Sequence, residues 1–200
     1  MTRIGVLADN HSRAADGSDV PQAVLDAFAG VDLIVHCGDS GSWGTLDRLE
    51  TVAPVVGVTG GHNGTGSDKR ITGDRRVIDV GGLRAGVAHD LVTLGLTTES
   101  APTFTPVSDD LGKALATFFG EPIDILLYAG THIARIAWAS GILLVNGGSP
   151  TLPADRPRPS LGTVAIVEVT EGIAAHNGAQ YVKSASARII ELAKEPAVTS

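Results

Sequence analysis

The chain of 200 residues contains little cysteine, few aromatic residues and no long hydrophobic run. Its single cysteine, Cys37, excludes an internal disulfide framework and fits a reducing compartment. No apolar run approaches the roughly 20 residues that a membrane-spanning helix needs, so a soluble protein is expected. The first residues, MTRIGVLADNHS, lack the apolar stretch and the small-residue cleavage site of a secretion signal, which predicts a cytoplasmic location.

Positive charge is also scarce. The 15 Lys and Arg residues stand against 22 Asp and Glu residues, and the net charge of -7 disfavours a broad nucleic-acid surface. The densest basic cluster, residues 69–76, is interpreted as a solvated turn. Length and hydrophobic content fit one domain over residues 1–200, with residues 195–200 expected to fray. The sequence leaves a homo-oligomer open.

Apolar segments of alternating strand and helix periodicity predict an α/β domain, starting with a βαβαβ unit. The predicted strands are residues 3–9, 32–39, 55–60, 75–80, 83–90, 123–130, 135–140, 141–150, 163–170 and 172–182, and the predicted helices are residues 19–31, 44–52, 109–120 and 186–195. Asp19 and Ser108 are expected to cap the first and third helices.

Polar side chains follow several of the predicted strands, at the ends where ligands bind in open sheets of this kind. These side chains are Asp9, His11, Asp39, His62, Asn63, His89 and His132. Carboxylate and imidazole together suit Mn²⁺, Zn²⁺ or Fe²⁺. Taken singly, each has an ordinary alternative as a turn residue, a helix cap or a hydrogen-bonded histidine. Their repetition favours a cation, because carboxylates gathered around one crevice repel one another without it.

Six segments carry a resemblance to a known family: IGVLADNH, LIVHCGD, VVGVTGGHN, GVAHD, LLYAGTH and GILLVNGGSP. In their order and approximate spacing they resemble the small calcineurin-like metallophosphoesterases, especially the compact bacterial and archaeal phosphodiesterases and the retromer subunit that shares their fold. The resemblance implies a four-layer α-β-β-α sandwich, in which two mixed β-sheets are flanked by helices. It also implies two metal ions at the strand ends.

The resemblance further implies which residues hold the first ion. Asp9 and His11 of the D-x-H box and His132 of the last histidine box correspond to its ligands, and Asp39 corresponds to the carboxylate that bridges both ions. This set is complete in the chain. One firmly bound divalent ion is therefore expected, with Mn²⁺ as the first choice and Zn²⁺, Fe²⁺ or Ni²⁺ as alternatives.

The second ion site departs from the family pattern. Gly61 stands where the family has an asparagine ligand, unless the loop slips and Asn63 takes that role. Gly130 replaces the first histidine of the G-H-T-H box, which leaves His89 as the clear ligand besides Asp39. Since even the loss of an outer-shell partner commonly costs about 10- to 100-fold in metal affinity, the second ion should be weak or absent.

His62 corresponds to the family residue that can protonate the leaving group or contact the scissile phosphate, so it is a candidate general acid if it faces the metal. The alternative is a loop histidine in a Gly-rich segment. Asn10 and Gly61 are candidate substrate contacts. The resemblance implies a metal-dependent phosphoesterase that hydrolyses a small phosphodiester or phosphomonoester by attack of a metal-bound water. The alternative is a catalytically inactive protein of the same fold that acts as a binding module through protein-protein contacts.

Overall fold

The computed structural model describes residues 1–92, 95–96, 110–174 and 180–193. Its strands are β1 (Thr2–Leu7), β2 (Leu33–His36), β3 (Val55–Gly57), β4 (Arg75–Val80), β5 (Leu83–Ala88), β6 (Ile125–Tyr128), β7 (Arg135–Ala139), β8 (Ile142–Asn146), β9 (Thr163–Ala174) and β10 (Gln180–Glu191). Its helices are α1 (Gln22–Ala27), α2 (Gly44–Glu50) and α3 (Leu111–Phe119). None of the helices in the described ranges is long and apolar enough to cross a membrane.

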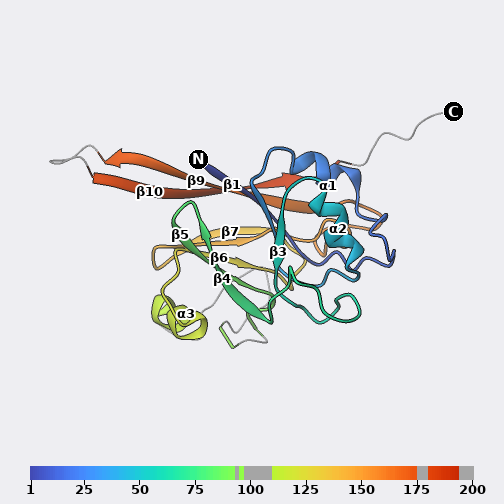
Figure 1. Ribbon diagram of the computed structural model, residues 1–200, viewed down its shortest axis with the longest axis horizontal. Helices are drawn as coiled ribbons and strands as arrows, with labels where there is room; N and C mark the ends of the chain where they lie inside the picture. Colours follow the sequence, from blue (N-terminus) through green and yellow to red (C-terminus); the bar gives the residue numbers. More distant parts are fainter. Residues whose placement is uncertain (93–94, 97–109, 175–179, 194–200) are drawn as a thin grey trace.

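The strands form two mixed sheets of five strands each (Figure 1). The first sheet has the order β10-β9-β1-β2-β3, in which β1, β2 and β3 are parallel and β9 and β10 are antiparallel. The second has the order β4-β5-β6-β8-β7, in which β5, β6 and β8 are parallel and β4 and β7 are antiparallel. In each sheet, therefore, three parallel strands end at one edge.

The apolar side chains form three clusters that separate four layers. Val6 and Leu127 belong to the cluster between the sheets, to which both sheets contribute. Helices α1 and α2 pack on the first sheet through a second cluster, and α3 packs on the second sheet through a third (Figure 1). The predicted four-layer α-β-β-α sandwich is confirmed.

The period-two alternation of β1 explains how one strand serves two layers. Ile4 and Val6 face the second sheet, whereas Leu7 faces the helices. Between them, Gly5 meets the Phe28 ring, and a Cβ at position 5 would lie 2.7 Å from that ring. A side chain here would therefore displace Phe28 from the helical layer.

Three local predictions are wrong. Residues 186–191 do not start a helix, because β10 pairs with β9 from Gln180 to Glu191 and this pairing overrides local helix propensity. Asp19 does not cap α1, whose N-cap is Pro21; its carboxylate instead accepts hydrogen bonds from Ser12, Arg13 and Ala14. The cap of α3 is Asp110 and not the predicted Ser108, which itself lies outside the described residues. The predicted frayed tail also lies outside the described residues, so that prediction stays open.

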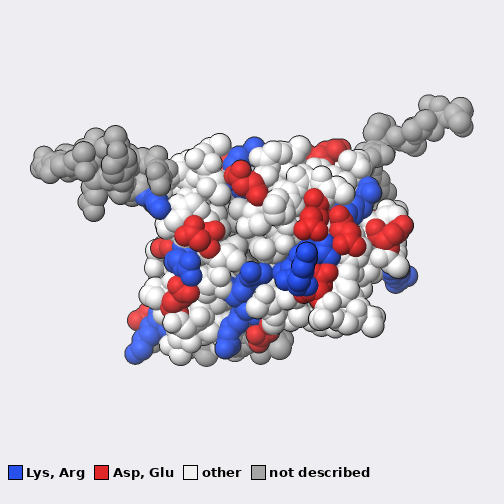
Figure 2. All heavy atoms as spheres, viewed as in Figure 1, with Lys and Arg blue, Asp and Glu red and all other residues white. Residues whose placement is uncertain are grey.

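The basic cluster at residues 69–76 is not simply a solvated turn. The Arg70 side chain is only 9% exposed and forms ion pairs with Asp47, Glu50 and Asp68. Figure 2 shows Lys and Arg side chains interspersed with Asp and Glu over α2 and β3. The cluster thus ties α2 to the chain that follows β3.

Candidate metal centre

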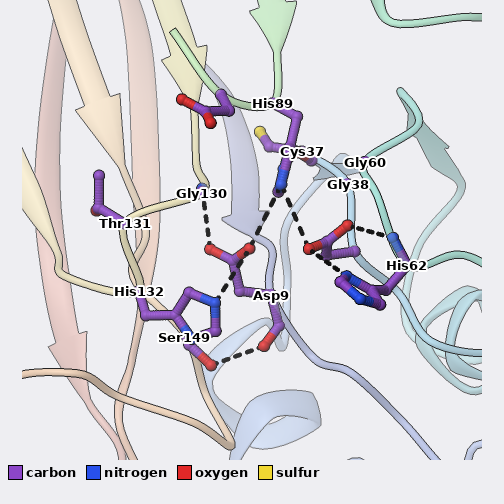
Figure 3. Close-up of polar contacts among 12 residues, drawn as sticks. Asp9, Cys37, Gly38, Gly60, His62, His89, Gly130, Thr131, His132 and Ser149 are labelled. Atoms are coloured by element: carbon purple, nitrogen blue, oxygen red, sulfur yellow. Dashed lines mark hydrogen bonds and ion pairs between the residues drawn. The ribbon is translucent and has the colours of Figure 1, made fainter. Parts of the chain in front are cut away.

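The two sheets bring the predicted ligands to one edge. Asp9 follows β1, Asp39 follows β2, His89 follows β5 and His132 follows β6. Figure 3 shows Asp9, His89, His132 and His62 directed toward one another. Because parallel strands of both sheets end here, side chains far apart in the sequence meet in one crevice.

Possible ligand atoms form three overlapping groups within the described ranges, and the atoms of each group lie within 4.8 Å of one another. The groups are Asp9, His11 and His132; His11, Asp39 and His62; and Asp9, Asp39 and His89. The four predicted ligands of the first ion thus lie in two adjacent groups that share His11. Asp39 also joins His89, as the predicted bridging carboxylate requires.

The distances between these atoms suit shared coordination better than direct hydrogen bonding. Asp39 Oδ2 lies 3.4 Å from Nε2 of both His11 and His89. Asp9 Oδ1 lies 3.7 Å from His132 Nε2 and 3.8 Å from His89 Nε2. Two ligand atoms that are each about 2.1 Å from one ion lie roughly 3 to 3.5 Å apart, so small adjustments would seat a cation among them.

Two ligand atoms have no hydrogen-bond partner although they are buried: Asp9 Oδ1 and His11 Nε2. Asp9 is completely buried, and a carboxylate oxygen without a donor costs free energy in such a place. A cation would satisfy both atoms at once. The donor set of carboxylate and imidazole therefore fits a divalent ion of borderline softness.

Two ligand histidines are oriented by backbone carbonyl groups. His89 Nδ1 donates to the Cys37 carbonyl at 2.7 Å, and His132 Nδ1 donates to the Leu152 carbonyl at 2.8 Å. With the proton on Nδ1, each Nε2 presents a lone pair to the crevice, as a metal ligand must. Sequence reasoning missed both carbonyl groups, because a backbone group leaves no mark in the residue types.

The backbone at the ligands is held in an unusual conformation. Among the described non-glycine residues, five have a positive φ, namely Asp9, His11, Asp39, His132 and Ser140. Four of the five are the predicted ligands of the first ion. Positive φ is uncommon outside glycine and persists only where surrounding contacts enforce it. Here the contacts include Ser149 Oγ donating to the Asp9 carbonyl at 2.7 Å.

The second-ion positions have the glycines expected from the sequence. Neither Gly61 nor Gly130 offers a side-chain ligand, although the Gly130 N–H donates to Asp9 Oδ2 at 3.1 Å. Asn63 is engaged elsewhere, since its Oδ1 accepts from the Gly60 N–H and its Nδ2 donates to the Gly60 carbonyl. The slipped-loop alternative therefore requires these two hydrogen bonds to break.

His62 and Asn10 lie beside the crevice in different settings. The His62 side chain is 73% exposed, and its backbone N–H donates to Asp39 Oδ1 at 2.7 Å. Asn10 is buried, and its Oδ1 accepts from His36 Nε2 at 3.0 Å because the Gly38 N–H occupies His36 Nδ1. Asn10 Nδ2 is a buried donor without a partner.

The electrostatics of the crevice follow from burial and from charge pairing. Burial raises the pKa of Asp9, although His89 and His132 oppose the rise. Burial also acts to raise the pKa of Asp39, but the nearby His89 ring and the hydrogen bond from the His62 backbone N–H outweigh it and hold that pKa well below its usual range. Asp39 is thus an ionised carboxylate at neutral pH, ready to bind a cation.

Comparison with known proteins gives consistent matches. A family model described as the calcineurin-like phosphoesterase superfamily domain matches residues 2–172. A probable metallophosphoesterase of Methanocaldococcus jannaschii is 33% identical over 153 residues, which cover 75% of this chain and 69% of that protein. A probable metallophosphoesterase of Methanothermobacter thermautotrophicus is 34% identical over 155 residues, which cover 75% and 78%.

Solved structures share the fold. Vps29 from Entamoeba histolytica, in complex with Zn²⁺, is 19% identical with a TM-score of 0.60, over 95% of this chain and 99% of that one. A structure described as a novel archaeal phosphodiesterase is 15% identical with a TM-score of 0.56, over 92% and 100%. At these identities the likeness shows the arrangement of the strands and helices alone.

Proposed function

Because the chain belongs to the calcineurin-like phosphoesterase superfamily, we propose that it is a metal-dependent hydrolase of small phosphodiesters or phosphomonoesters. The observation that carries the proposal is the pair of buried, unpartnered atoms Asp9 Oδ1 and His11 Nε2, grouped with His132. We assign one firmly held ion to Asp9, His11, Asp39 and His132. Mn²⁺ is our first choice, and Zn²⁺, Fe²⁺ or Ni²⁺ are alternatives.

A divalent ion bound there supplies Lewis acidity, which polarises a phosphoryl oxygen and lowers the pKa of water. The residues of the chain do the rest. Asp9 and Asp39 would offset the charge of such an ion, and the Leu152 carbonyl orients the His132 ring that would help to hold it. Because Asp9 is fully buried, solvent water does not compete with the ion for its carboxylate.

We assign the transfer of a proton to His62. Its Nδ1 lies 3.4 Å from Asp39 Oδ2, and the ionised carboxylate makes Nδ1 the donor of that contact. Nε2 is then the atom that can protonate a leaving oxygen, and the exposed position of the ring lets a substrate reach it. Asn10 and Gly61 are the proposed substrate contacts, since both line the hollow beside His62.

The test combines metal content with turnover. We expect the purified protein to contain about one divalent ion per chain and to hydrolyse bis-p-nitrophenyl phosphate with Mn²⁺ but not after chelation. Asp39→Ala should lose both the ion and the activity. Asp26→Ala, which makes the same change on the exposed surface of α1, is the matched control. Absence of turnover with every divalent ion would refute the proposed hydrolase.

A second candidate is an inactive binding module of the same fold, favoured by the glycines at positions 61 and 130. In that case the parent chain hydrolyses no ester, while the double variant Gly61→Asn and Gly130→His gains activity. A parent that already matches the double variant eliminates the binding module. The parent's own turnover therefore discriminates between the two functions.

A further inference from the structure

Two hollows flank the candidate metal centre, and Gly61 and His62 line both of them. The smaller, of about 470 Å³, is lined by acidic residues that include Asp74 and Asp39. The larger, of about 890 Å³, is lined by Arg13 and Arg158. A substrate phosphate held beside His62 would thus have negative charge on one side and positive charge on the other.

The two arginines differ from most others in the chain. In the part that the structure describes, no hydrogen bond or ion pair involves either guanidinium. By contrast, seven arginine side chains donate to carboxylate or carbonyl oxygens: Arg3, Arg48, Arg70, Arg76, Arg84, Arg156 and Arg188. Arg13 and Arg158 therefore keep all five N–H donors of each fork available to a ligand.

The loop that carries Arg13 is anchored by the carboxylate of Asp19. The Asp19 carboxylate accepts from the Arg13 N–H at 2.8 Å and also from Ser12 Oγ and the Ala14 N–H. Burial acts to raise the pKa of Asp19, but these hydrogen bonds outweigh it and lower the pKa. Asp19 also lines the larger hollow, yet its charge is shared among three donors and does not neutralise the Arg13 side chain.

The loop that carries Arg158 is anchored in a different way. Pro157 and Pro159 flank the residue and restrict its backbone. Two residues earlier, Arg156 donates to Glu191 of β10 at 2.6 Å and to the Leu161 carbonyl at 3.3 Å. Arg13 and Arg158 therefore both lie on loops whose backbone is constrained. This constraint reduces the conformational entropy that the loops lose when a ligand binds.

We propose that Arg13 and Arg158 bind a second anionic group of the substrate, a phosphate or carboxylate that is not cleaved. The preferred substrate is then a phosphate ester with two anionic groups. Guanidinium forks match the oxygens of either group bidentately. The smaller hollow disfavours an anion, since Asp74 and Asp90 line it and would repel the anion. This inference rests on the proposed hydrolase function.

The experiment compares matched esters with and without the second anion. The pairs are 2-phosphoglycolate with ethyl phosphate, and fructose 1,6-bisphosphate with fructose 6-phosphate. In at least one pair, KM with Mn²⁺ should be about tenfold lower for the member with two anions, and high salt should narrow the gap. Arg13→Gln and Arg158→Gln should each raise KM for that member, and Arg13→Lys should retain part of the gap.

The control is Arg84→Gln, which removes the same charge at the start of β5, remote from the hollow, and should leave the gap intact. Equal KM values within both pairs would overturn the inference and leave the hydrolase standing. If no ester is hydrolysed, the hydrolase fails and calorimetric titration of the same pairs decides. Equal affinities for both members then overturn the inference, and a tenfold gap that Arg158→Gln removes supports it.

Discussion

His36 lies beneath the candidate metal centre with both ring nitrogens engaged. Nδ1 accepts from the Gly38 N–H, and Nε2 donates to Asn10 Oδ1. The ring is completely buried, and burial lowers its pKa to about 3. His36 is thus a neutral imidazole that fixes the orientation of the Asn10 amide. Asn10 Nδ2 remains without a hydrogen-bond partner and can donate to a ligand.

This burial predicts a loss of stability in acid. Below an unfolded-state pKa of about 6.5, the unfolded chain takes up a proton at His36 that the folded chain excludes until pH 3. The free energy of unfolding should therefore fall by about 1.4 kcal/mol per pH unit from this residue, between pH 6.5 and pH 3. His36→Gln should remove that part of the slope in urea unfolding measured with chelator.

The free energy of unfolding of the wild type minus that of His36→Gln should decrease as the pH falls from 7.5 to 4.5. If the His36 difference is the same at every pH, the neutral buried imidazole is the wrong description.

At the scale of the elements, the loops after β3 and β6 leave different amounts of space for a side chain at their glycines. A Cβ at Gly61 would come no closer than 3.9 Å to Asp39 Oδ1. At Gly130, φ is +83° and a Cβ would lie 3.1 Å from the Asp90 Cβ. Asp90 thus fills the space that a side chain at position 130 would need.

Substitutions at the two glycines should therefore have unequal effects. Gly61→Asn should change the free energy of unfolding by less than about 0.5 kcal/mol. It should also lower the dissociation constant of a second ion at least about tenfold. Gly130→His should cost about 1 to 3 kcal/mol, since it adds positive-φ strain to a close contact. Urea unfolding and calorimetric metal titration measure the two effects.

Asp90→Gly should relieve part of the cost of Gly130→His, because it removes the crowding Cβ. A double-mutant cycle should show a coupling of at least about 0.5 kcal/mol in the direction of rescue. Strict additivity of the two substitutions would show that Asp90 and position 130 do not compete for the same space.

The same scale explains which predictions succeeded. The alternation of Ile4, Val6 and Leu7 shows local strand character, and parallel strands place their carboxyl ends together whatever their order in the sequence. Taken alone, the pattern of residues 186–191 is equally compatible with a helix. They are extended because they pair with β9, whose paired residues lie more than ten positions earlier in the sequence. Local periodicity carries no information about such distant pairing. The carbonyl partners of His89 and His132 were out of reach for a related reason, since any residue has a carbonyl.

At the scale of the whole molecule, the candidate metal centre joins the two sheets. Asp9, His11 and Asp39 follow strands of the first sheet, whereas His89 and His132 follow strands of the second. Elsewhere the sheets are held together by the apolar cluster between them. A bound ion would add a polar connection across the sandwich at the edge where that cluster ends.

Metal binding should therefore stabilise the whole fold. Saturation at a hundred times the dissociation constant corresponds to about 2.7 kcal/mol, or roughly 5 to 10 °C in Tm for a chain of this size. His132→Ala, which removes a ligand from the second sheet, should abolish most of this shift in differential scanning calorimetry with Mn²⁺. A full shift in the variant would place the ion on the first sheet alone.

Asp9→Asn should separate the cost of the buried charge from the benefit of the ion. Without metal, burial raises the pKa of Asp9 and its Oδ1 has no donor, so the neutral amide should make the apoprotein as stable as the parent or more stable by about 1 kcal/mol. The Asn oxygen can still accept from the Gly130 N–H. With Mn²⁺ the order should reverse, because only the carboxylate holds the cation. Asp26→Asn, an exposed change on α1, should behave as the parent in both conditions. If Asp9→Asn gains as much Tm from Mn²⁺ as the parent does, Asp9 is not a ligand, and its burial must serve the packing of β1 instead.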